Sequence, residues 1–92
     1  MLPRTVINTE LSKQLVRSSC SVGANYTEAN EALSKKDFVI RIKICLKEAK
    51  ESAYWLKLVE ASNPDFSEAQ TPLLKESMEL TKIFGSILLK SR

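Results

Sequence analysis

Apolar residues recur along most of this chain at intervals of three and four positions, the spacing that places them on one face of an α-helix. The clearest case is the stretch 34–62, which contains no Gly or Pro. At about 1.5 Å per residue it predicts a helix of roughly 43 Å. Ser34 is the expected N-cap, and Asp37 adds a negative charge in the first turn. Pro64 should end the helix, because it disfavours the α conformation at Asn63.

A second helix is expected over about residues 5–30, with Thr5 as its N-cap. The positions predicted for its buried face are Ile7, Leu11, Leu15, Ser18 or Ser19, Val22, Tyr26 and Ala29. Small residues crowd its second half around Gly23. This glycine either weakens the helix locally or lets a neighbouring backbone approach closely, and the grouping of small residues favours the close approach.

A third helix is expected over about residues 72–90, with Thr71 as N-cap and Pro72 in the first helical position. A start nearer Phe66 would place Pro72 inside the helix and kink it. The predicted buried stripe contains Leu73, Leu80, Ile83, Phe84 and Ile87. Three amphipathic helices with short loops predict an all-α fold, an up-and-down antiparallel helical bundle that forms a single domain over residues 1–92.

The central helix has more apolar positions than one core face needs. Its predicted core face contains Phe38, Val39, Ile42, Cys45, Leu46, Ala49, Ala53 and Leu56. A second apolar group lies on nearly the opposite side and contains Ile40, Ile44, Trp55 and Leu58. A helix that is apolar on two sides must bury both. The second group is therefore a candidate subunit interface with Trp55 as its anchor; the alternatives are cover for a fourth helix or scattered surface residues.

A third side of the same helix carries a row of lysines within an arc of about 80°. The row consists of Lys36, Lys43, Lys47, Lys50 and Lys57. Such a row can follow a phosphate backbone, although a solvated face with aliphatic stems over apolar neighbours is the commoner meaning. The net charge of +3 and the pI of about 9.0 permit an acidic partner such as nucleic acid without requiring one.

Composition limits the chemistry that this chain offers. Histidine is absent, and no Gly-rich phosphate loop, metal-ligand cluster or nucleophile motif occurs. We therefore expect no enzyme activity, no catalytic, cofactor or metal site, and no small-molecule substrate. Cys20 and Cys45 are expected to be reduced thiols. The absence of a long apolar run predicts a cytoplasmic protein with no membrane partner.

The segment 11–30 has a Gln, an Arg, small residues and then Ser-apolar-x-x-Asn-x-x-Glu, a series carried by Gln14, Arg17, Ser21, Val22, Asn25 and Glu28. It resembles the small bacterial four helix bundle protein family, also called the 23S rRNA-intervening-sequence protein family, although Ala29 stands where that family usually has Gly. The residues Ser-Lys-Lys-Asp-Phe at 34–38 are similar to the family's Ser-Lys-Lys-Glu-Phe, and EAKESAYWLKLV at 48–59 resembles one branch of it. The resemblance covers nearly the whole chain.

This resemblance implies a helical bundle that assembles into a ring, typically a homopentamer, without known enzyme activity. Arg17, Asn25 and Glu28 are then expected to serve helix packing and hydrogen bonds between subunits. The leading hypothesis is a homo-oligomeric assembly or scaffold protein. Related accessory proteins of diversity-generating retroelements are basic pentamers that bind a reverse transcriptase and nucleic acid, which makes a nucleic-acid-binding accessory the alternative.

The family usually has a further helix before the lead-in that Leu2 and Pro3 begin here. We expect that helix to be missing from this chain, through a short start or a truncation, or because a partner fills its place. A remnant of three helices should expose apolar surface, which favours self-association. A helix from another protein that binds in the gap is a third possibility.

Overall fold

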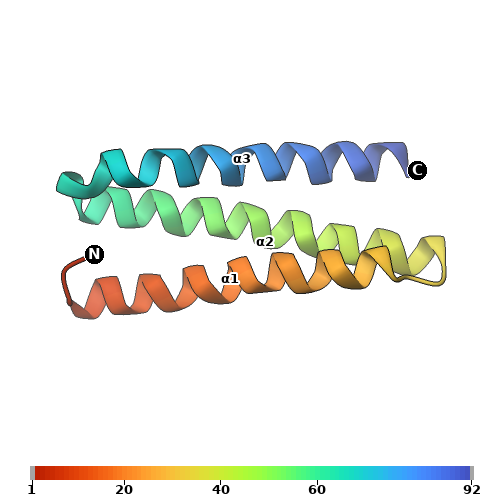
Figure 1. Cartoon of the computed structure of the whole chain (residues 1–92), viewed down its shortest axis with the longest axis horizontal. Coiled ribbons are helices and arrows are strands. Elements are labelled where there is room, and N and C mark those ends of the chain that lie inside the picture. The colour runs from red at the N-terminus through yellow and green to blue at the C-terminus, as the bar shows by residue number, and fades with distance from the viewer. Residues whose placement is uncertain (1, 92) are drawn as a thin grey trace.

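The computed structural model of this chain describes residues 2–91, and the side chains of all of these except 66–71. The elements are α1 (Val6–Asn30), α2 (Lys35–Ser62), the short 3₁₀ helix η1 (Pro64–Phe66) and α3 (Ser67–Lys90). Consecutive long helices run antiparallel (Figure 1). No strand occurs within the described residues, so the predicted all-α fold is confirmed.

The first two helices begin where side-chain caps were predicted. The backbone N–H of Asn8 donates to Thr5 Oγ1 at 3.0 Å, and the N–H of Asp37 donates to Ser34 Oγ at 3.1 Å. Each bond satisfies one of the amide groups that a helix leaves unpaired in its first turn. Asn63 ends α2, and its N–H donates to the carbonyl of Glu60 at 3.3 Å.

The predicted start of the third helix is wrong, because α3 begins at Ser67 and continues through Pro72 as one element. A proline inside a helix removes one hydrogen bond, the one to the carbonyl four residues earlier. Here only one turn precedes Pro72, and η1 has already brought the chain into a helical path. The lost bond therefore falls near an end of the helix, where many backbone groups are unpaired in any case.

The three long helices lie alongside one another, with α2 between α1 and α3 (Figure 1). The molecule measures 45 × 20 × 14 Å along its principal axes, and no Cα atom of α1 comes within 8 Å of one in α3. Each outer helix therefore packs mainly on α2. The predicted bundle is open on one side rather than closed around a central axis.

The core lies where α2 meets both outer helices. Its fully buried residues are Ala29, Ile42, Cys45, Ala49 and Phe84. Partly buried side chains of Val22, Phe38, Leu46, Leu80, Ile87 and Leu88 pack against them. The aromatic rings of Tyr26 and Phe84 lie 6.1 Å apart between centroids and join α1 to α3 above α2. The predicted core face of α2 is thus confirmed at Ile42, Cys45 and Ala49.

The predicted buried faces of the outer helices need four corrections, one of which is Tyr26, whose side chain is 45% exposed. Ile7 is 61% exposed, and the neighbouring Asn8 is buried in its place. Leu73 and Ile83 of the predicted α3 stripe are more than half exposed. Ile7 is displaced because Asn8 turns inward to pair with Asn63, whereas the exposed residues near the α1/α3 gap are left open because α1 and α3 pack mainly on α2 rather than on each other.

Gly23 does not provide the close backbone contact that the sequence suggested. A Cβ atom built on Gly23 meets no other atom within 4 Å. The reason is the separation of α1 from α3, which leaves Gly23 beside open space. Within this chain the group of small residues on α1 is therefore explained by contact with α2 at some positions and by exposure at others.

Candidate interaction surfaces

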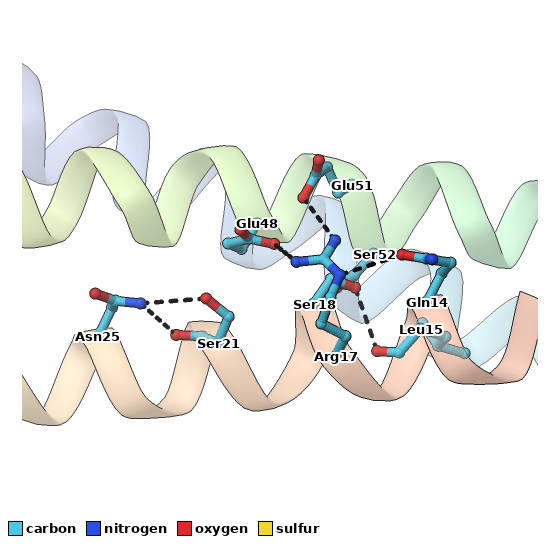
Figure 2. Close-up of polar contacts among 9 residues, drawn as sticks. All are labelled: Gln14, Leu15, Arg17, Ser18, Ser21, Asn25, Glu48, Glu51 and Ser52. Carbon is cyan, nitrogen blue, oxygen red and sulfur yellow. Dashed lines mark hydrogen bonds and ion pairs between the residues drawn. The ribbon is translucent and has the colours of Figure 1, made fainter.

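Arg17 of α1 is the centre of a charged cluster with α2. Its Nη1–H donates to Glu48 Oε2 at 3.3 Å and its Nη2–H donates to Glu51 Oε2 at 3.2 Å, while its Nε–H donates to Gln14 Oε1 at 3.1 Å (Figure 2). The guanidinium side chain is about half exposed, at 49%, but Glu48 is buried. The cluster thus ties a solvent-facing cation to a carboxylate inside the α1/α2 interface.

The pKa values of the charged groups in this cluster are shifted by burial and by the hydrogen bonds and charges of their neighbours. Burial raises the pKa of Glu48, and the hydrogen bond to Glu51 raises it further. The pKa of Glu51 is lowered by its hydrogen bonds to Glu48 and Arg17. The hydrogen bond to Glu51, helped by the charge of Glu48, raises the pKa of Arg17. Glu48 is thus the carboxyl group that gains a proton first as the pH falls.

Further polar contacts continue along the α1/α2 interface on both sides of Arg17. The hydroxyl groups of Ser18 and Ser52 are 2.8 Å apart in a buried hydrogen bond, and the Ser18 hydroxyl also donates to the carbonyl of Leu15 at 3.2 Å (Figure 2). Arg41 Nη1–H donates to Asn25 Oδ1 at 3.0 Å. These contacts lie along the middle and one end of the helix pair.

At the other end, the two buried amides of Asn8 and Asn63 donate to each other at 2.9 and 2.8 Å. Each amide also donates to a backbone carbonyl, that of Pro3 or Val59, at 2.9 Å. Four polar groups are thereby satisfied in one closed arrangement, which anchors the lead-in before α1 to the end of α2.

The structure shows what the polar residues of the sequence pattern do within one chain. Arg17 and Asn25 both form hydrogen bonds with side chains of α2. Glu28 is exposed on α1. The sequence reasoning missed the partners Glu48, Glu51 and Arg41. A signal was available, because two acids three residues apart on one helix face an arginine on the preceding antiparallel helix.

The second apolar group on α2 is only partly open to solvent. Ile40 is 45% exposed, but Ile44, Trp55 and Leu58 are half-buried. The indole Nε1 of Trp55 is buried without a hydrogen-bond partner within the described part of the chain. The rings of Tyr54 and Trp55 meet edge to face, with centroids 5.1 Å apart. One chain therefore covers most of this group and leaves Ile40 as its most exposed member.

A more open apolar surface lies between α1 and α3. It is a groove of about 360 Å³ lined by Val22, Gly23, Tyr26, Leu80, Ile83, Phe84 and Ile87. Tyr26 and Ile83 are about half exposed on its two sides. This groove was not predicted as an interaction site, because it depends on the separation of α1 from α3 rather than on the apolar pattern of either helix.

All five lysines of the predicted row are exposed. The structure divides them, however, because only Lys50 and Lys57 line a groove between α2 and α3. That groove has a volume of about 330 Å³, and its other lining residues are Ala53, Tyr54, Met78, Thr81 and Lys82. Lys82 of α3 was not among the predicted residues, since it belongs to a different helix. Among the residues that the structure describes, no lysine forms an ion pair.

Two negative findings apply to residues 2–91. Outside the side chains of 66–71, they contain no group of three or more side chains arranged to hold a metal ion. None of their helices combines the length and the apolar character needed to cross a membrane.

Comparison with known proteins identifies the family. The model of the family described as 23S rRNA-intervening sequence protein matches residues 2–86. A crystal structure of a protein of unknown function from the S23 ribosomal protein family of Bacteroides thetaiotaomicron is 38% identical and superposes with a TM-score of 0.81. The match covers 92% of this chain and 75% of that chain. Among curated proteins none matches. The resemblance of residues 11–30 to the family pattern is thus confirmed, and the chain belongs to the 23S rRNA-intervening sequence protein family.

Proposed function

We propose that this protein is a non-catalytic assembly module that acts as a homo-oligomer, with a ring of five subunits as the form that the family resemblance favours. The observation that carries the proposal is the apolar surface left open in the α1/α3 groove and at Ile40 of α2. Tyr26 and Ile83 flank the α1/α3 groove at 45% and 52% exposure. Ile40 is exposed on another side of α2, since it lies about 200° around the helix from the buried Ile42.

Apolar patches of this kind on a small domain are typical of sites where proteins associate. An open bundle also gains more from association than a closed one, because a second subunit can cover the gap between α1 and α3 without breaking any contact within the subunit. In the proposed oligomer the subunit contacts involve Ile40, Ile44, Trp55 and Leu58, with the α1/α3 groove as a further contact. Glu28, exposed on α1, is available to the same contacts.

Light scattering coupled to size exclusion tests the proposal at roughly 50 μM subunit, since association depends on concentration. The wild-type chain is expected to elute as an oligomer. Ile40→Asp and Ile83→Asp should each shift it toward the monomer, because each places a carboxylate in a proposed contact. Val6→Asp is the matched control, because Val6 is 88% exposed at the start of α1 and outside both surfaces. A wild-type chain that is strictly monomeric would contradict the proposal.

Nucleic-acid binding is a second candidate function, supported by the exposed lysines of α2. The row of Lys36, Lys43, Lys47, Lys50 and Lys57 is exposed, without ion pairs among the described residues. Binding through such a row should weaken steeply with salt, because each neutralised phosphate releases counterions. A polarisation titration with a labelled RNA hairpin tests this, and reversal of Lys43, Lys47 and Lys50 to Glu should abolish binding. No binding at low salt would remove this candidate.

A further inference from the structure

The groove between α2 and α3 combines features that are separate elsewhere on the molecule. Lys50 and Lys57 stand on its α2 side and Lys82 on its α3 side, while Ala53 and Met78 supply apolar lining. Among the described side chains, no acidic residue lines the groove, and Glu79 of α3 is exposed outside it. The groove therefore has cationic sides around an apolar interior, and it attracts an anion that also carries apolar or aromatic surface.

Tyr54 adds a group suited to stacking. Its side chain is 55% exposed in the lining of the groove. The edge-to-face contact with Trp55, at 5.1 Å between ring centroids, limits the orientations of the tyrosine ring. The ring lies between the lysines at positions 50 and 57, which are about 10.5 Å apart along the helix axis. A strand that places phosphates on these lysines has a base within reach of the ring.

We propose that this groove binds single-stranded nucleic acid, with phosphates on Lys50, Lys57 and Lys82 and an unpaired base stacked on Tyr54. The inference rests on the nucleic-acid candidate above and makes it more specific. It moves the site from the lysine row of α2 to a groove between two helices, and it leaves Lys36 outside the site. A duplex is the poorer ligand, because its bases are already stacked on one another and present no free face to Tyr54.

The test is a polarisation titration of the full-length protein at low salt with labelled oligouridylate and oligothymidylate 20-mers and with an RNA hairpin of equal length. Lys82→Glu should weaken binding of the single strands by about tenfold or more. Tyr54→Ala should weaken it by roughly 5- to 100-fold, the range reported for loss of one base–aromatic stack, and Tyr54→Phe should keep the wild-type affinity. The logarithm of the binding constant should fall with log[salt] at a slope of about −2, as expected for three phosphates on a single strand.

Lys13→Glu is the matched control, because it makes the same charge change on an exposed lysine of α1 that belongs neither to the groove nor to the lysine row of α2. It should alter affinity less than threefold. Equal losses for Lys13→Glu and Lys82→Glu would overturn the groove while leaving nucleic-acid binding in place. If the hairpin bound more tightly than the single strands and Tyr54→Ala left that binding unchanged, the groove would likewise be overturned while nucleic-acid binding remained. No binding of any probe would overturn both nucleic-acid proposals and leave the assembly proposal standing. Circular dichroism melts of the variants, compared with Lys82→Gln, identify any loss due to unfolding.

Discussion

The two helix interfaces of this protein are built in different ways. Between α1 and α2, side-chain hydrogen bonds and ion pairs recur from Asn8 and Asn63 at one end to Asn25 and Arg41 at the other. Between α2 and α3, the structure shows no side-chain hydrogen bond or ion pair among the described side chains, and Phe84 with its apolar neighbours makes the contact. The same central helix is therefore held by geometry-specific bonds on one side and by non-directional packing on the other.

This difference suggests which interactions stabilise the helix pairs and which fix the alignment of one helix along the other. Apolar burial contributes about 25 cal/mol per Å² wherever the surfaces fit, so it stabilises a helix pair without selecting one alignment strictly. A buried hydrogen bond contributes only about 1 kcal/mol net, but leaving its partner unsatisfied costs about 1–3 kcal/mol. The α1/α2 alignment is therefore expected to be sharply specified, and the α2/α3 alignment more tolerant of small shifts.

The largest effect is expected at the apolar interface. Phe84→Ala removes a buried ring from the core and should lower the free energy of unfolding by about 3–5 kcal/mol. Urea titration followed by circular dichroism measures this loss. Leu89→Ala is the control, because its side chain is 67% exposed outside the proposed contacts and its loss should cost under about 1 kcal/mol. Similar losses for the two variants would show that the apolar packing does not dominate α2/α3.

The next effect concerns the asparagine pair. Asn8→Leu leaves the buried Asn63 amide without its partner and should cost about 1–3 kcal/mol. The double variant Asn8→Leu, Asn63→Leu should be more stable than the sum of the single losses predicts, because no orphaned amide remains. Urea midpoints of the four proteins form a double-mutant cycle. Strict additivity would mean that the pair does not act as a unit at the α1/α2 interface.

A smaller change tests a position outside both interfaces. Gly23→Ala should raise the free energy of unfolding of the subunit by about 0.5–1 kcal/mol, because alanine is the better helix former and the added methyl group meets no neighbour. Thermal melts at low concentration measure this gain. If light scattering also shows weaker association of the variant, the added methyl group obstructs a subunit contact in the α1/α3 groove. A destabilised monomer would contradict the open space beside Gly23.

The smallest effect is the pH dependence of the Glu48–Glu51 pair. The pKa of Glu48 is raised above its ordinary value of 4.5, so the folded state holds this proton more tightly than the unfolded chain does. Its contribution to stability is therefore lost as the pH rises from 4.5 through the raised pKa. Glu51 has a lowered pKa, and its contribution is present above 4.5 and lost as the pH falls through the lowered pKa. The contribution of the pair should be greatest near pH 4.5.

Urea midpoints measured across this range for the wild-type chain and Glu48→Gln provide the comparison. The stability of the wild-type chain relative to the variant should decline as the pH rises above 4.5, because the variant has no proton to lose at that site. Val6→Ala, at an 88% exposed and non-titratable position of α1, is the control and should leave the pH trend of the wild-type chain unchanged. A wild-type advantage that is independent of pH would contradict a role for the buried carboxyl group.

The sequence alone determined the features of this protein that depend on neighbours along the chain. Thr5 and Ser34 cap their helices through bonds that span three residues, so these starts follow from local spacing. The core face of α2 follows from the helical period at Ile42, Cys45 and Ala49.

Only the tertiary structure decided how each helix is rotated and which helices touch. The inward position of Asn8 depends on Asn63 at the end of α2. The ion pairs of Arg17 depend on Glu48 and Glu51 of α2. The α2/α3 groove places Lys82 in the same lining as Lys50. A helical repeat specifies which residues share a face, but not what lies opposite that face. Those contacts are set by the combined packing of all three helices, to which every residue contributes only a small part of the free energy.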